Sequence, residues 1–308
     1  MKPPLFKSLQ FRLPSLVLLG VIPTTIMAIA VSSSHASKII HQDYLDNLAL
    51  KGQSLHDTID RWRQMNVLAL KNLTQQPDII SLDPQKQKPI LEAMVNNYEY
   101  IYLAHTLDLQ GLNIARSDNK TPQNYSDSNW FKAAKAGEEI TFQTLIEPTS
   151  EKSSLCLATP ISQQKTIAGV ASICTLLEEL ARQIGDVTFG QTGYGFIVNE
   201  RGYLLTHPNA DLISEDELID YSAYPPVANL LAGNDGYYPF TDTEGVEWVS
   251  HGMRLSNGWG VLILQQKSEA LLQEKEFHSL AAIVAGIAIV AVGILTWLLT
   301  SRLINSLN

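Results

Sequence analysis

Three aromatic side chains in the middle of the sequence are the best candidates for the wall of a small-molecule site. Tyr125 comes first, and Trp130 and Phe131 follow as an adjacent pair. Sites for small ligands have mostly apolar and aromatic walls, with a few polar groups that fix the ligand's orientation. The same aromatic residues could equally be the buried face of a short helix, and both interpretations stay open.

Residues that could perform covalent catalysis do not form a recognisable set. His207 precedes Pro208 at the end of an expected strand and has no evident nucleophile or carboxylate partner, so we interpret this pair as structural. The acidic run 215–217 is typical of a solvated helix face rather than a calcium loop. The sequence contains no phosphate-binding loop, metal-binding histidine pair or nucleophile elbow. It therefore predicts neither an enzyme nor a cofactor.

The chain contains two cysteines, Cys156 and Cys174, at a spacing that matches no zinc site. They fall on two expected neighbouring strands. The turn near residues 163–164 would place them offset rather than directly opposite, and a disulfide requires Cα atoms within about 7 Å. We therefore expect two free thiols. A disulfide is the alternative, since an exported compartment permits one.

Two segments without any charged residue lie near the ends of the chain, at 13–31 and 280–300. They contain 19 and 21 residues, and an apolar helix of about 20 residues crosses a bilayer core. Basic residues lie between each segment and its chain end, which predicts that residues 1–12 and 301–308 are cytoplasmic. A cleaved signal peptide is the alternative for the first segment, because residues 34–36 resemble a small-residue cleavage site.

The segment 32–279 between them carries all 31 acidic residues and 18 of the 22 basic residues, for a formal charge of −13. With both chain ends in the cytoplasm, this segment is predicted to be periplasmic or extracellular, on a chain that crosses the plasma (inner) membrane twice. Its acidic character argues against nucleic acid as a partner.

Hydrophobic spacing predicts the elements that would hold these side chains. Residues 36–75 form a long helix whose apolar residues repeat every seven positions, which suits pairing with a second copy or packing on the domain body. Pro89 suits the first turn of a second helix that runs to residue 97. Strands are expected at 98–107, 139–147, 153–160, 167–174, 193–198, 203–208, 236–241, 247–253 and 258–264.

These elements describe an α+β fold with two helix-flanked antiparallel sheets. A strand, a turn ending in glycine and a second strand occur around Gly111 and again around Gly202. After the last strand, the charged helix 268–279 continues into the second apolar segment without Pro or Gly. A rigid helix that joins a sheet to a membrane can transmit a small displacement.

In their order and spacing, several short motifs resemble the double Cache sensor domain of bacterial receptors. The motifs are Asp108–Gly111, Tyr125, Trp130-Phe131, Gly169-Val170, Gly193–Val198, Gly202, Thr206–Pro208 and Gly258-Trp259. The resemblance covers about residues 36–275. It implies a long N-terminal helix with two tandem PAS-like modules, a membrane-distal one at about 76–184 and a proximal one at about 185–267. Residues 301–308 resemble the start of a HAMP linker.

The resemblance also implies a ligand site in the distal module, built from Tyr102, Tyr125, Ser128, Trp130, Phe131, Glu147 and Cys174. Two of these residues depart from the amino-acid-binding members of the family. Ser128 stands where those members have an arginine that holds the ligand carboxylate, and Cys174 stands where they have an aspartate that pairs with the ligand ammonium. A serine cannot supply a bidentate guanidinium clamp. An α-amino acid held in the usual way is therefore not expected.

These observations predict a receptor input module that binds a small extracytoplasmic ligand and passes a conformational signal across the membrane. The family resemblance implies a homodimer and an output through a chemoreceptor, sensor histidine kinase or diguanylate cyclase. Two alternatives stay open: the front end of such a kinase or cyclase, with its catalytic domain beyond residue 308, and a stand-alone membrane-anchored binding protein. An exported hydrolase ranks lowest, because the sequence shows no nucleophile and base pair.

Overall fold

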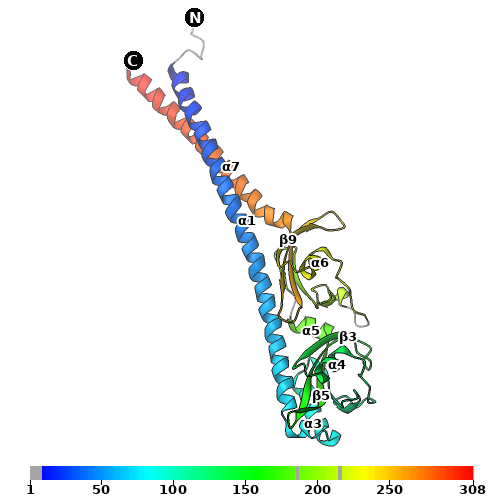
Figure 1. Ribbon diagram of the computed structural model, residues 1–308. Coiled ribbons are helices and arrows are strands. Elements are labelled where there is room, and N and C mark those ends of the chain that lie inside the picture. Colours follow the sequence, from blue (N-terminus) through cyan, green and yellow to red (C-terminus); the bar gives the residue numbers. More distant parts are fainter. Residues whose placement is uncertain (1–8, 185–186, 214–216, 308) are drawn as a thin grey trace. The chain divides into compact units, whose positions relative to one another are not determined.

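The computed structural model of the protein describes residues 9–184, 187–213 and 217–307 (Figure 1). The chain divides into two units, one formed by the residues up to Asn47 together with those from Lys267, and the other by Leu48–Gln266. The expected α+β architecture is confirmed: a long N-terminal helix, two antiparallel sheets and an apolar helix at each end of the chain.

The first unit contains the two apolar segments, each inside a continuous helix. Helix α1 (Leu9–Thr74) has 66 residues, so the helix predicted at 36–75 is the C-terminal part of a longer one. Helix α7 (Lys267–Leu307) has 41 residues and joins the charged segment to the second apolar segment without a break, as predicted. Both helices contain stretches long and apolar enough to cross a membrane. Their apolar side chains are largely exposed, which suits a helix that faces lipid.

The N-terminal module of the second unit, which keeps the name distal module from the sequence prediction, is a five-stranded sheet in the order β2-β1-β5-β4-β3. Its strands are β1 (Ile101–Leu107), β2 (Asn113–Arg116), β3 (Thr141–Ile146), β4 (Ser153–Gln163) and β5 (Thr166–Leu176). All of their pairings are antiparallel. The helices of this module are α2 (Pro77–Ile80), α3 (Pro84–Asn97), α4 (Asn129–Lys135) and α5 (Leu177–Ile184).

The predicted start of the second helix at Pro89 is wrong. Helix α3 begins at Pro84, and Pro89 lies inside it. The Asp83 carboxylate accepts a hydrogen bond from the Gln85 amide at 3.0 Å. An aspartate at the N-cap followed by a proline at the first helical position is a stronger start signal than an isolated proline, because it satisfies free amide groups of the first turn.

The proximal module is a sheet in the order β6-β7-β11-β10-β9, with β8 paired to β7. Its strands are β6 (Thr188–Phe189), β7 (Gly193–Val198), β8 (Leu204–Thr206), β9 (Gly236–Thr241), β10 (Glu247–Arg254) and β11 (Gly260–Gln266). The short helices η2 (Ala210–Leu212) and α6 (Pro225–Leu231) complete it. Residues 215 and 216 of the predicted acidic helix face lie outside the described residues.

The predicted repetition of a strand, a glycine turn and a strand is present in both modules. Gly111 follows β1 with φ +86°, and Gly202 follows β7 with φ +89°. A Cβ on Gly111 would lie 2.6 Å from the Ser126 backbone nitrogen, and one on Gly202 would lie 2.8 Å from the Ser222 Cα. Any other residue would meet both a strained backbone and a steric clash at these two turns.

Helix α1 uses its seven-residue repeat to pack on its own domain, which is one of the two predicted alternatives. Leu55 and Ile59 of the repeat are buried. A Cβ on Gly52 would lie 3.2 Å from Nδ1 of His251 in β10, so the helix backbone approaches the proximal sheet closely. Toward the distal module, Lys71 forms an ion pair with Glu139. The second unit therefore has α1 as a common support for both sheets (Figure 1).

Candidate functional site

One face of the distal sheet brings together most of the predicted site residues. His105 and Leu107 of β1 share this face with Ser172 and Cys174 of β5, because side chains alternate along a strand and the cross-strand partners are His105–Ser172 and Leu103–Cys174. Helix α4 covers the face, and its Trp130 and Phe131 are 1% and 2% exposed. Tyr125 is 2% exposed and belongs to the same hydrophobic cluster. The aromatic residues are thus the core of this layer, which is one of the two interpretations, and their part in a ligand site stays a prediction.

The expectation of two free thiols is wrong, because Cys156 and Cys174 form a disulfide. They are direct cross-strand partners with Cα atoms 4.1 Å apart. The hairpin turn lies at residues 164–165, one residue beyond the predicted turn. The pairs next to it, Gln163–Thr166 and Ser162–Ile167, would place Cys156 one position away from Cys174. An irregularity between Ile161 and Ser162 then shifts the register by one residue. This bulge brings the two cysteines opposite each other.

The disulfide changes the chemistry of the predicted ligand position at Cys174. Cys156 and Cys174 form a small buried cluster with Leu103. Tyr102 and Leu145 pack against this cluster. The Tyr102 hydroxyl lies 3.0 Å from the Ser154 hydroxyl and also accepts from Ser150. Burial raises the pKa of Tyr102 to about 12, so its hydroxyl is protonated. This end of the site therefore offers a cross-link in place of a titratable thiol.

Tyr125 and Glu147 belong to a buried polar network centred on Arg116, at the end of β2. The Tyr125 hydroxyl donates to the Glu147 carboxylate at 2.6 Å and accepts from Arg116 Nη1 at 3.0 Å. Arg116 also donates from Nε and Nη2 to both oxygens of Asp118, at 2.8 and 2.7 Å. Burial alone would raise the pKa of Glu147, but hydrogen bonds from Thr149, Tyr125 and backbone amides outweigh it and lower that pKa. The network therefore contains a charged carboxylate held in place beside the aromatic wall.

Sequence reasoning missed Arg116, although the chain contained a signal for it. Arg116 ends a strand in which it follows Ile114 and Ala115, and it precedes Asp118 by two positions. A charged residue inside a short strand is unusual unless it is paired, and its partner is most often close by. The side chain of Arg116 is 3% exposed and that of Asp118 is 17% exposed. A buried ion pair of this kind fixes the loop that carries Tyr125.

Ser128 is the predicted site residue that the structure places least favourably. It is half-buried at the N-cap of α4, where its side chain forms no capping hydrogen bond. Its backbone carbonyl accepts from the Lys132 amide at 3.1 Å. The structure thus gives Ser128 a part in the start of α4, and its membership in a ligand site stays a prediction.

Three polar atoms in the distal layer have no hydrogen-bond partner among the described residues. They are Nε2 of His105, Nε1 of Trp130 and Oγ of Ser172. His105 and Ser172 are 0% exposed, and the rings of His105 and Trp130 lie 5.8 Å apart between centroids. A buried polar group without a partner costs roughly 1–3 kcal/mol, so three on one side of a sheet are not accounted for by stability. Each of these atoms is chemically able to form a hydrogen bond with a polar atom of a bound molecule.

The hydrogen bonds around His105 define which ring nitrogen carries a proton. Asn113 Oδ1 accepts from Arg116 Nη1 at 3.1 Å and from the Gln123 amide at 2.8 Å. Asn113 Nδ2 must then be the amino group, and it lies 2.8 Å from His105 Nδ1. Burial, and then the positive charge of Arg116, lower the pKa of His105 to about 3. The ring is therefore neutral, accepts at Nδ1 and carries its proton on the unpartnered Nε2.

The depressed pKa of His105 predicts a loss of stability in mild acid. Between the ordinary pKa of 6.5 and about 3, the unfolded chain takes up a proton at this ring while the folded protein does not. The free energy of unfolding should then fall by up to about 1.4 kcal/mol per pH unit as the pH drops from 6 to 4. Arg116, Asp118 and Glu147 face the ring and stay charged over most of this range.

His105→Gln keeps an acceptor for Asn113 but does not titrate. We expect a shallower pH dependence of the free energy of unfolding for this variant, measured by urea denaturation from pH 6 to pH 4. If the free energy of unfolding falls equally steeply with pH in the variant and the native chain, another group causes the acid sensitivity.

Replacing Ser172 by alanine should stabilise the ligand-free protein. The substitution removes a buried hydroxyl without a partner, which should raise the free energy of unfolding by about 1 kcal/mol. Ser250 is the matched control, because it is 1% exposed in the proximal sheet and donates to the Tyr238 carbonyl at 2.9 Å. Ser250→Ala should lower the free energy of unfolding by about 1 kcal/mol. A higher unfolding temperature for Ser172→Ala and a lower one for Ser250→Ala would support the conclusion that the Ser172 hydroxyl has no partner. A lower unfolding temperature for Ser172→Ala would contradict it.

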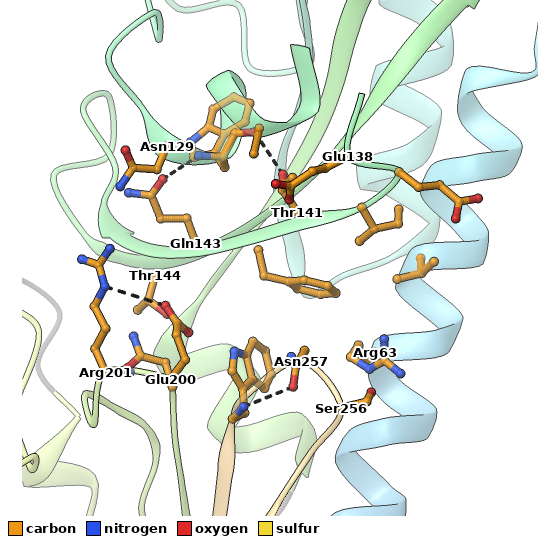
Figure 2. Close-up of a pocket in the computed structure, with 18 of the residues that line it drawn as sticks. Arg63, Asn129, Glu138, Thr141, Gln143, Thr144, Glu200, Arg201, Ser256 and Asn257 are labelled. Carbon is orange, nitrogen blue, oxygen red and sulfur yellow. Dashed lines mark hydrogen bonds and ion pairs between the residues drawn. The ribbon is translucent and has the colours of Figure 1, made fainter. Parts of the chain in front are cut away.

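A cleft of about 890 Å³ adjoins the aromatic cluster (Figure 2). Its wall includes Trp130 and Gln143 from the distal module, Arg63 from α1, and Arg201 and Asn257 from the proximal module. The Gln143 side chain accepts from the Trp130 amide at 2.9 Å. Figure 2 shows this bond and, on the opposite wall of the cleft, Asn257 and Ser256. The backbone of Trp130 therefore lies at the border between the buried cluster and an open space.

Comparisons with known proteins agree with this architecture. The family model for the Cache domain, in its double form, matches residues 35–273. The methyl-accepting chemotaxis protein PscA of Pseudomonas syringae pv. tomato is 25% identical over 278 residues, which are 83% of this chain and 42% of PscA. PctB of Pseudomonas aeruginosa, also a methyl-accepting chemotaxis protein, is 25% identical over 319 residues, 99% of this chain and 48% of PctB. This chain thus spans less than half the length of either relative.

Solved structures show the same fold at lower sequence identity. The ligand-binding domain of the Campylobacter jejuni chemoreceptor Tlp3 with L-norvaline has a TM-score of 0.61 at 14% identity, and the match covers 75% of this chain and 94% of that domain. The domain of the Pseudomonas fluorescens chemoreceptor CtaA with L-leucine has a TM-score of 0.61 at 20% identity, with coverage of 76% and 99%. Both similarities concern the fold alone.

Proposed function

Because the chain belongs to the double Cache family of sensor domains, we propose that it is the ligand-binding input module of a transmembrane receptor. In this proposal, residues 13–31 and 280–300 cross the membrane and residues 32–279 lie on its outer side. Residues 301–308 begin a HAMP-like cytoplasmic linker. The apolar helices and the basic residues at both chain ends support this topology, as does the disulfide, since structural disulfides persist in exported compartments.

The observation that carries the proposal is the group of three unpartnered polar atoms beneath α4. His105, Trp130 and Ser172 place them in an apolar, aromatic layer from which water is excluded. Unpartnered buried groups lower the stability of the free protein, and a ligand that accepts their hydrogen bonds would offset this loss. We therefore place the ligand site of the receptor in this distal layer, next to Tyr125 and Phe131.

The signal leaves the sensor domain through the connection between β11 and α7. Strand β11 ends at Gln266 and α7 begins at the next residue, Lys267, with no loop between them. A movement of this central strand therefore acts directly on the helix that reaches the membrane. A ligand shifts the balance between two such arrangements only by its difference in affinity for them.

We propose a second copy of this chain as the partner on the exposed face of α1. Leu50, Met65 and Leu68 are 66%, 61% and 60% exposed. Leu50 and Leu68 are 18 residues apart, about five helical turns, so they lie on one side of the helix. Two copies anchored in the same membrane run in the same direction, and a two-fold axis would place this stripe against its own copy.

Leu68→Asp should weaken dimerisation of the full chain in detergent by at least about tenfold, because it places a charge in an apolar contact. Lys38→Gln is the matched control, since it changes the charge of the same helix by the same amount and lies on a different face of α1 from the stripe. Analytical ultracentrifugation gives both dissociation constants. An unchanged constant for Leu68→Asp would exclude this face as the dimer contact.

The Cache region is a sensor domain and not a catalytic one. The relatives are methyl-accepting chemotaxis proteins, and they extend well beyond the matched part. We propose that this input module acts on a cytoplasmic signalling output, either a chemotaxis-type signalling domain or a kinase or cyclase. A stand-alone binding protein that passes its signal to a separate membrane partner is the second candidate. A reading of the gene downstream of Asn308 distinguishes the two.

Thermal unfolding of the full chain in lipid nanodiscs, with a panel of small metabolites, tests the proposed function. A ligand of the distal layer should raise the unfolding temperature of the native chain and of Ser250→Ala. The same ligand should raise it much less in Ser172→Ala and Trp130→Phe, because each variant removes one of the donors. Ligands that act equally on all four proteins would place the binding site elsewhere and contradict the proposal.

A further inference from the structure

We propose that the distal site selects an uncharged molecule with a carbonyl-type acceptor oxygen and an apolar skeleton. This inference rests on the proposed function, because it names the ligand class of the same site. It follows from which polar groups of the site are free, which are already bonded, and what charge surrounds them.

The free groups are donors of hydrogen bonds. The indole nitrogen of Trp130 can only donate, and the neutral ring of His105 must donate from Nε2 because Asn113 already bonds to its Nδ1. The Ser172 hydroxyl can rotate to donate as well. His105 and Ser172 are direct partners on neighbouring strands, so their side chains point to the same side of the sheet. The missing partner is therefore an acceptor.

The guanidinium of Arg116 has no donor left for a ligand carboxylate. Its Nε bonds to Asp118, its Nη1 to Asn113 and to the Tyr125 hydroxyl, and its Nη2 to Asp118 and to Thr149. These five bonds use all five N–H groups of an arginine side chain. Ser128, at the position of the family's carboxylate clamp, brings no positive charge.

The carboxylate of Glu147 already accepts four hydrogen bonds from the protein, as many as a carboxylate has lone-pair sites in total, so it is committed to the network rather than to a ligand ammonium. One of its oxygens accepts from the Tyr125 hydroxyl, and the other accepts from the Thr149 amide, the Thr149 hydroxyl and the Ser150 amide. Cys174 is bonded to Cys156 and offers no anion. An ammonium group in this layer would lose its water without gaining a charged or strong acceptor, which is costly.

The local charge also disfavours a carboxylate. Arg116, Asp118 and Glu147 together carry a net charge of −1 beside the three donors, and His105 adds none. Tyr125, Trp130 and Phe131 supply an apolar wall. An uncharged carbonyl oxygen satisfies the donors without bringing a second negative charge into this poorly solvated layer.

Three probes with one carbon skeleton test this selectivity. They are 3-methylbutanamide, which is neutral, 3-methylbutanoate, which is anionic, and L-valine, which is zwitterionic. Isothermal titration calorimetry of the full chain in lipid nanodiscs should show that the amide binds at least about tenfold more tightly than either charged probe. Ser172→Ala should weaken amide binding severalfold, and Ser250→Ala should leave it unchanged.

An equal or tighter affinity for L-valine or for the carboxylate overturns the inference, and so does a failure of the amide to bind. The titrations of Ser172→Ala distinguish an error in the inferred ligand class from an error in the proposed location of the site. If a charged probe binds and Ser172→Ala weakens it, the distal site stands and only the ligand class is wrong. If Ser172→Ala and Trp130→Phe affect no ligand of the native chain, the distal site itself is wrong.

Discussion

Arg116→Met should lower the free energy of unfolding of the sensor domain by about 3–5 kcal/mol. Removal of one partner from a buried ion pair leaves the other charge without compensation. Here the Asp118 carboxylate would keep only the Lys120 amide as a donor, one side of the Tyr125 hydroxyl would lose its donor, and Thr149 would lose its bond to the guanidinium. The loop that carries Tyr125 should then lose its fixed position over the distal sheet. Urea denaturation of the full chain, followed by tryptophan fluorescence, measures the change.

Arg63→Met is the matched control for that measurement. Arg63 pairs with Asp60 on α1 at 2.7 Å, but the two side chains are 20% and 28% exposed, against 3% for Arg116. A partly exposed pair of this kind contributes about 0–1 kcal/mol. Similar losses for Arg63→Met and Arg116→Met would mean that the buried network has no special part in stabilising the distal module.

Loss of the disulfide should produce the second large effect. Cys156 and Cys174 are 18 residues apart, and a cross-link that closes a loop of this size stabilises a protein by roughly 3 kcal/mol. The double variant Cys156→Ala/Cys174→Ala should lower the free energy of unfolding by about that amount. A reductant should lower the unfolding temperature of the native chain and leave that of the double variant unchanged.

An equal unfolding temperature for the native chain with and without reductant would contradict this expectation, provided that thiol labelling confirms reduction. Both cysteines are 1% exposed, so the labelling is carried out on the denatured protein after the reductant is removed. The result also bears on location, since the bond persists only where the surroundings are oxidising.

The parts of this fold that depend on local pattern could be predicted from the sequence. The two apolar helices follow from runs without charge, and the sheet strands follow from clusters of β-branched and aromatic residues. The glycine turns at Gly111 and Gly202 follow from the need for a positive φ. These features need only neighbouring residues, and the structure confirms them.

The wrong start of α3 came from overlooking a local signal, the Asp83 cap before Pro84, but the disulfide and the full network of Arg116 depend on distant residues. The disulfide depends on a bulge near Ile161 that changes the register by one residue, and no local pattern in β4 or β5 indicates it. The role of Arg116 depends on Tyr125 and Thr149, which reach it from separate loops. Sequence order could place Tyr125, Trp130 and Glu147 in one region, but not identify the unpartnered nitrogen of His105 beside them.

The membrane topology is the premise on which the receptor function depends, and cysteine labelling in intact cells tests it most directly. Among the described residues there is no free cysteine, so a single introduced thiol is labelled selectively. Thr243→Cys lies on an exposed turn of the proximal module, and Ser301→Cys lies beyond the second apolar segment. With a membrane-impermeant maleimide, we expect Thr243→Cys to be labelled and Ser301→Cys to be labelled only after lysis. Labelling of Ser301→Cys in intact cells, with Thr243→Cys protected, would contradict the account.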